Sequence, residues 1–178
     1  MTTTDYRIYV ASLTDYSNGI LHGRWIDITD VDSVWDEINA MLAESPTAKE
    51  TGCPAEEWAI HDYEFGPVHL SEHESIEELV AMAEAAEEHG EAFLAWVSHE
   101  PRHNRDPHDF ENSFQGEWTS LEEYVIDWWE QTGGLPKADF WAHPLNYIAW
   151  DRLSQDWEIN GDVFTIDSPN GVYVFSNR

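Results

Sequence analysis

The sequence is poor in basic residues. Only 8 of its 178 residues are Lys or Arg, against 36 Asp or Glu, which gives a formal net charge of -28 at pH 7. Nucleic acids and anionic membrane surfaces bind proteins through clustered basic side chains. Eight scattered bases cannot outweigh so many acids. The sequence therefore argues against nucleic acid and membrane as partners, and it predicts a cationic partner.

Cysteine and long apolar runs are also scarce. Cys53 is the single cysteine, so no disulfide can form within the chain, which fits a reducing cytoplasm. No apolar stretch approaches the roughly 20 residues that a membrane-spanning helix needs. The start of the chain lacks the basic and apolar regions of a signal peptide. We therefore expect a soluble, cytoplasmic protein.

Sequence motifs for catalysis or metal binding are missing as well. The chain contains no G-x-S-x-G, Walker, G-x-G-x-x-G or EF-hand pattern. The segment His99-Glu-Pro-Arg-His103 matches H-E-x-x-H only formally, because Pro101 interrupts the helix that would place both histidines on one face. We expect no catalytic residue, no metal and no cofactor. An acidic hydrolase that uses carboxylate or metal chemistry is the alternative. Carboxylate pairs suited to glycoside hydrolysis abound, but among 36 acids they are expected by chance and carry almost no information.

Apolar and aromatic residues are plentiful. Hydrophobic residues make up 42% of the chain, with 10 Trp, 7 Tyr and 7 Phe, so the sequence predicts packed cores and excludes disorder. The C-terminal third is rich in aromatic residues. Its Trp128-Trp129 pair is typical of a packed core or a subunit interface, and a sugar site is the competing interpretation. We expect a homodimer.

Local patterns predict an α+β fold with three small domains on one chain. Turn residues and proline set the boundaries that we expect, with an N-terminal α+β domain over 1–66, a central helical acidic domain over 67–103 and a C-terminal α+β domain over 104–178. The expected strands are 6–12, 20–28, 57–64, 163–167 and 172–175, and the expected helices are 33–44, 75–88, 91–98, 108–115, 120–131 and 145–157. Asn170-Gly171 predicts a tight hairpin turn with positive φ.

The acids are concentrated between positions 50 and 130. No base occurs between Lys49 and Arg102, while fourteen acids do, and eight acids lie between Arg105 and Lys137. Like charges repel one another, so an unneutralised tract suggests a use. The competing interpretation is a solvated acidic surface, such as a salt-loving host favours. The candidate partner-binding carboxylates are Glu56, Glu57, Asp62, Glu64, Glu72, Glu74, Glu77, Glu78, Glu84, Glu87, Glu88, Glu91, Asp109, Glu111, Glu117, Glu122, Glu123, Asp127 and Glu130.

An extended surface of spaced carboxylates resembles the phosphates of duplex DNA. B-form DNA carries one charge per roughly 1.7 Å of helix axis, so 28 net charges correspond to roughly 48 Å of duplex and a dimer to roughly 95 Å. The amount of charge is thus sufficient for mimicry of DNA.

Several segments in order along the chain resemble the ArdA family of antirestriction proteins. They are 8–16, Asn18-Gly19, 23–27, 56–64, 114–124, 147–151 and 172–175. The segment 114–124 is similar to the antirestriction region of that family. Its residues that carry the similarity are Phe114, Gln115, Gly116, Glu117, Trp118, Ser120, Glu122, Glu123 and Tyr124.

The resemblance implies a function. It implies an elongated chain of three small domains that forms a dimeric, non-enzymatic mimic of bent B-form DNA. This mimic would occupy the DNA-binding groove of a type I restriction-modification enzyme, in the methyltransferase core. Genes of this family typically ride on plasmids and other mobile genetic elements, so the implied role is protection of incoming DNA. The carboxylates named above would then stand at phosphate positions.

Overall fold

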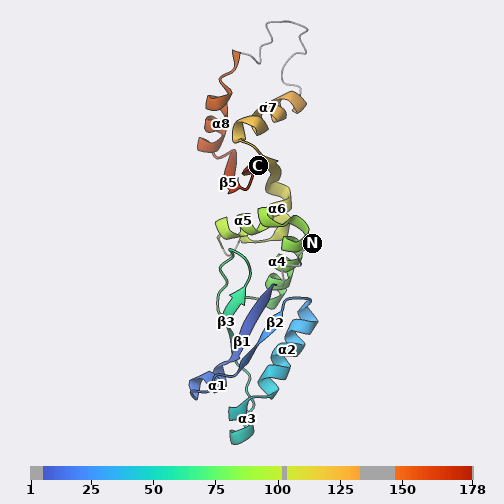
Figure 1. Ribbon diagram of the computed structural model, residues 1–178, viewed down its shortest axis with the longest axis vertical. Helices are drawn as coiled ribbons and strands as arrows, with labels where there is room; N and C mark the ends of the chain where they lie inside the picture. Colours follow the sequence, from blue (N-terminus) through green and yellow to red (C-terminus); the bar gives the residue numbers. More distant parts are fainter. Residues whose placement is uncertain (1–5, 102–103, 133–146, 178) are drawn as a thin grey trace. The chain divides into compact units, whose positions relative to one another are not determined.

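A computed structural model describes residues 6–101, 104–132 and 147–177 (Figure 1). It contains helices and two small antiparallel sheets, so the α+β prediction is confirmed. The chain divides into two compact units, 1–107 and 108–178. The finer division into three domains in an elongated chain stays a prediction.

The first unit contains one sheet and most of the helices. Its elements are β1 (Arg7–Ser12), α1 (Leu13–Ser17), β2 (Gly23–Asp27), α2 (Val31–Ala43), α3 (Pro46–Thr51), β3 (Trp58–Glu64), α4 (Ile76–His89) and α5 (Glu91–His99). The strands predicted at 6–12, 20–28 and 57–64 and the helices predicted at 33–44, 75–88 and 91–98 all correspond to observed elements.

The sheet of the first unit has the order β2-β1-β3, with both neighbouring pairs antiparallel. One face packs against α2, where Ile8 and Val10 lie buried with residues such as Ile38. Because strand side chains alternate between faces, Tyr9 and Trp25 lie on the other face, with ring centroids 5.7 Å apart. Figure 1 shows α2 running beside the sheet.

Local signals set both ends of α4. The hydroxyl of Ser75 accepts a hydrogen bond from the backbone N–H of Glu78 at 3.2 Å, which caps the helix as the sequence predicts. Gly90 has φ +63°, a backbone conformation that suits glycine, and separates α4 from α5. The apolar stripe that contains Ile76, Leu79 and Val80 is buried, so the glutamates of α4 are left on the outer surface.

The second unit contains the other sheet. Its elements are α6 (Pro107–Ser113), which begins at the boundary, β4 (Phe114–Trp118), α7 (Leu121–Thr132), α8 (Trp150–Ile159), β5 (Val163–Ser168) and β6 (Gly171–Ser176). The sheet order is β4-β6-β5, again antiparallel. Trp128 and Trp129 pack against a buried cluster that includes Tyr124 and Val174. The pair therefore contributes to the core, one of the two roles expected for it.

Several elements differ from the prediction. The helix expected over 108–115 ends at Ser113, because Phe114 begins β4, pairs with Phe175 and stacks on Phe110 at 4.9 Å. The short helices α1 and α3 were not expected. The helix expected over 145–157 begins at Trp150 and ends at Ile159, while 145–146 lie outside the described residues.

The hairpin turn also differs. Ser168 pairs with Gly171, so the two turn residues are Pro169 and Asn170 and not Asn170 and Gly171. Neither turn residue has a positive φ. Gly171 has φ +154° and is required for another reason, because a Cβ there would lie 2.2 Å from the carbonyl oxygen of Trp118. The glycine permits the close approach of two backbones.

Candidate anionic binding surface

The structure places the candidate carboxylates at the surface. Seventeen of the nineteen are exposed, and Glu74 and Asp127 are partly buried. They come from many elements of both units, including the segment before β3, the segment before α4, and the helices α4, α5, α6 and α7. Their exposure leaves these side chains accessible to a binding partner. That they stand at the positions of DNA phosphates stays a prediction.

Some of these carboxylates are bound within the chain. The guanidinium of Arg7 donates two hydrogen bonds to Glu64, at 2.7 and 2.8 Å, and this bond to Arg7 lowers the pKa of the Glu64 carboxyl. Glu117 accepts hydrogen bonds from the backbone and side-chain amides of Asn170, both at 3.3 Å. These side chains are less available to a partner than their exposure suggests.

Short local contacts hold several more of these acids. The Ser75 hydroxyl donates to Glu77 at 2.7 Å and lowers the pKa of its carboxyl. Glu123 accepts from the hydroxyl and backbone N–H of Thr119, which also lowers its pKa. Glu74 accepts from the backbone N–H of Ser71, and Asp127 accepts from Gln131. Such carboxylates help to cap and brace local structure.

The side-chain carboxylates of ten of the nineteen form no hydrogen bond or ion pair with any described residue. They are Glu56, Glu57, Glu72, Glu78, Glu84, Glu88, Glu91, Asp109, Glu122 and Glu130. We call this set the uncommitted carboxylates. They are the members of the predicted site that the folded chain leaves fully available for an external cation.

The bases of the first unit that the structure describes are already occupied. Arg7 binds Glu64, and Arg24 bridges Glu37 and Glu44 at 2.9 and 2.7 Å. Lys49 donates to the carbonyl oxygen of Glu44, and Arg105 donates to that of His69. These four bases are thus bonded to groups other than the uncommitted carboxylates.

The segment 114–124, which resembles an antirestriction motif, forms β4, a turn and the start of α7. Gly116 has φ +106° at an irregularity in the pairing of β4 with β6. The indole N–H of Trp118 donates to the carbonyl oxygen of Gln115 at 3.0 Å, and the Ser120 hydroxyl accepts from the N–H of Glu123 at 3.2 Å. These residues shape the entry to α7, which leaves Glu122 exposed in its first turn.

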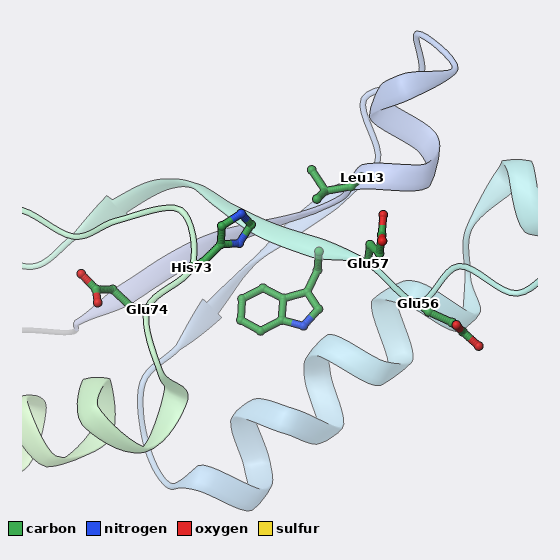
Figure 2. Close-up of a pocket in the computed structure, with 6 residues that line it drawn as sticks. Leu13, Glu56, Glu57, His73 and Glu74 are labelled. Carbon is green, nitrogen blue, oxygen red and sulfur yellow. The ribbon is translucent and has the colours of Figure 1, made fainter.

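A hollow of about 480 Å³ lies in the first unit, lined by Leu13, Glu56, Glu57, Trp58, His73 and Glu74. Figure 2 shows Leu13, Glu57 and His73 around its centre, while the carboxylates of Glu56 and Glu74 point outward on opposite sides. Sequence reasoning included the three glutamates but missed Leu13, Trp58 and His73. They come from three separate segments, and only the fold brings those segments together.

Sequence reasoning also missed the buried acid Asp15, which has no exposed surface. Its Oδ1 accepts a hydrogen bond from the backbone N–H of Thr47 at 2.9 Å. Burial alone would raise the pKa of this carboxyl, but hydrogen bonding with Thr47, Ser45 and Ser12 outweighs burial and holds the pKa far below its ordinary value. Asp15 therefore ties α1 to α3 and takes no part in the surface.

The described residues contain no group of three or more His, Cys, Asp or Glu side chains that could hold a metal ion. The helix α5 ends at His99, and Glu100 is already extended, so the helical turn that H-E-x-x-H requires does not continue from His99. His103 lies outside the described residues. Within the same described ranges, no helix is both long and apolar enough to cross a membrane.

Comparison with models of known protein families identifies a family that this chain matches. The family model described as "Antirestriction protein (ArdA)" matches residues 8–172, which is nearly the whole chain. No curated protein matches the chain significantly.

Proposed function

The chain belongs to the ArdA family of antirestriction proteins, and from this membership we propose that it inhibits type I restriction-modification enzymes by mimicking B-form DNA. In this proposal the protein occupies the DNA-binding groove of the methyltransferase core and thereby keeps DNA out. It acts as a stoichiometric inhibitor and has no substrate of its own.

The uncommitted carboxylates are the observation that carries the proposal. A DNA-binding groove presents Lys and Arg at intervals along its length. The protein offers ten exposed carboxylates that are bonded to no other residue in 6–101, 104–132 or 147–177, and they are spread over several elements. An acidic surface that serves only solubility needs no binding partner. Antirestriction proteins do have one, and the basic DNA-binding groove of a restriction enzyme is complementary in charge to these carboxylates.

The uncommitted set also refines which acids take part. Glu64 and Glu117 already hold cationic or amide donors within the chain, so their exchange for enzyme contacts would break internal bonds. We therefore place enzyme contacts at the uncommitted carboxylates, which include Glu78, Glu84 and Glu88 on α4 and Glu122 and Glu130 on α7. We also propose that the active species is a homodimer.

Titration of a restriction enzyme tests the proposal against an enzymatic mechanism. A fixed amount of a purified type I enzyme is mixed with increasing amounts of this protein, and DNA cleavage is measured at once and after long preincubation. A binding inhibitor gives full inhibition near a fixed molar ratio that preincubation does not change. Inhibition that deepens with time at substoichiometric amounts would indicate turnover and contradict the proposal.

No observation favours the alternative of an acidic hydrolase. A general acid of the glycosidase type has a carboxyl pKa raised by an apolar site or a neighbouring charge. Among the described carboxyl groups, those with a shifted pKa have it lowered, as in Asp15, Asp30 and Glu64. A lowered pKa keeps a carboxyl group ionised, so these groups are poor proton donors.

A further inference from the structure

We propose that the hollow lined by Leu13, Trp58 and Glu57 receives one basic side chain of the bound enzyme, an arginine or a lysine, together with the backbone that carries it. This inference rests on the proposed function, since it assigns a specific contact within that complex. Such a contact would make the hollow a point of strong, directional binding within the acidic surface.

The walls of the hollow are apolar. Leu13 at the start of α1 and Trp58 at the start of β3 are both only partly buried, so each keeps accessible apolar surface. The indole of Trp58 is braced edge-on by Trp35, with centroids 5.7 Å apart and planes at 83°. Such a braced ring is a firm surface for the long aliphatic stem and cationic head of a basic side chain.

The rim of the hollow is anionic. Glu57 lies beside the opening, and Glu56 flanks it (Figure 2). Both belong to the uncommitted carboxylates, whereas Glu74 is held by Ser71 and points away. An anion or a DNA phosphate would be repelled, and a cation would be attracted. Charge complementarity therefore selects a basic side chain for this site.

The size of the hollow fits a side chain with its backbone. Its volume of about 480 Å³ lies within the range of about 300 to 1,000 Å³ that ligand pockets occupy. A second copy of this chain is a poorer occupant, because it carries 36 acids and 8 bases. The basic groove of a DNA-binding enzyme supplies many suitable side chains.

The same sheet already contains this kind of contact. The guanidinium of Arg7 lies 4.8 Å from the ring centroid of Trp25 and binds both oxygens of Glu64. An indole and a carboxylate thus hold an arginine on the outer face of the sheet. At the hollow, Trp58 and Glu57 offer the same two groups, and the cation would come from the enzyme.

A pair of matched variants tests the inference. Leu13→Lys places a lysine of the chain itself in the hollow, where its ammonium can reach Glu57 and exclude the incoming side chain. Leu21→Lys makes the same charge change at a residue of the same unit that is 74% exposed and lies outside the hollow. The measurement is the Kd of each variant for a purified type I methyltransferase core, with thermal melting to confirm folding.

We expect Leu13→Lys to raise the Kd at least tenfold and Leu21→Lys to raise it less than threefold. Equal losses in the two variants would mean that only net charge matters and would overturn the inference. A change in oligomeric state for Leu13→Lys with an unchanged Kd would identify a second copy as the occupant and would also overturn it.

A second pair keeps the test decisive if Leu13→Lys does not fold. Glu57→Gln and Asp36→Asn remove one exposed carboxylate each, the first at the hollow and the second outside both the hollow and the candidate binding surface. We expect the Kd to rise about fivefold or more for Glu57→Gln and less than twofold for Asp36→Asn, and equal effects would contradict the inference. Failure of the wild-type protein to bind the methyltransferase core would instead overturn the proposed function.

Discussion

Asp15 and the surface glutamates have opposite roles, although both are carboxylates. The Asp15 side chain is fully buried and bound to the backbone of Thr47, so its charge stabilises the fold. The uncommitted carboxylates are exposed and repel one another, so their charge opposes folding. Removing a charge should therefore destabilise the protein at Asp15 and leave it intact or slightly more stable at the surface.

Replacement of Asp15 tests the structural side of this contrast. Asp15→Ala removes the acceptor for the buried N–H of Thr47, and we expect a loss of about 1 to 3 kcal/mol in the free energy of unfolding. Urea unfolding of the wild type and the variant at pH 7 measures it. An unchanged midpoint would show that α1 and α3 do not depend on this carboxylate.

The same variant has a defined pH dependence. Because the folded pKa of Asp15 lies below its ordinary value of 3.8, its charge stabilises the fold fully above that value. The stability is lost as the pH falls toward the folded pKa. The difference in unfolding free energy between wild type and Asp15→Ala should thus be constant from pH 7 to about 5 and shrink below pH 4. A difference that grows on acidification would contradict the assignment.

At the scale of elements, Gly171 allows the start of β6 to lie close to the end of β4. A Cβ at this position would lie 2.2 Å from the carbonyl oxygen of Trp118 and 2.7 Å from the Cα of Thr119, both backbone atoms. Gly161 is the matched control, because it has φ +73° but open space around it.

We expect Gly161→Ala to cost about 1 kcal/mol from its backbone conformation. Gly171→Ala should cost about 3 kcal/mol or more, since the strand pair must also separate. Denaturant unfolding of both variants provides the comparison. Equal costs would mean that the contact between β6 and the end of β4 is not tight.

Patterns of hydrophobic spacing and capping were sufficient to predict most elements from the sequence. The helix α4 is an example, because its apolar stripe, its Ser75 cap and Gly90 all lie within one short segment. The strand β4 was mispredicted because Phe114 is drawn into a sheet by Phe175, which is 61 residues away in the chain. Local patterns do not report such distant pairings.

The candidate surface was predictable in outline and not in detail. An excess of acids between positions 50 and 130 is visible in the sequence, and the structure places these acids at the surface. Which of them are bound internally depends on partners such as Arg7 for Glu64 and Asn170 for Glu117, both more than fifty residues distant. The apolar walls of the hollow could not be predicted for the same reason.

At the scale of the whole molecule, inhibition should depend on the sum of many carboxylates. A single exposed ion contact contributes about 0 to 1 kcal/mol, so Glu78→Gln, Glu84→Gln or Glu88→Gln alone should change the inhibition constant little. Replacement of all three together with Glu122 and Glu130 should weaken inhibition strongly and leave thermal stability equal or higher.

Inhibition constants and melting temperatures of the single and combined variants measure this sum. Complete loss of inhibition from one of these conservative replacements, in a well-folded protein, would refute the distributed mechanism. It would also restore the catalytic interpretation, because removal of one essential acid or base typically costs roughly 10² to 10⁴ in rate.

Assembly is a second property of the whole molecule. A homodimer would double the number of carboxylates offered to the enzyme. We expect sedimentation equilibrium at micromolar concentration to give twice the 20.5 kDa of one chain. A single species at 20.5 kDa would contradict this prediction and leave DNA mimicry to the monomer.

The most direct test of DNA mimicry is displacement of duplex DNA from a purified type I methyltransferase core. Labelled duplex is bound to the core, and the protein is added at low and at high salt. We predict complete displacement, an apparent Kd that rises in proportion to the DNA concentration, and weaker binding as salt screens the exposed charges. A complex in which the core holds DNA and this protein together, or an affinity that does not change with salt, would contradict it.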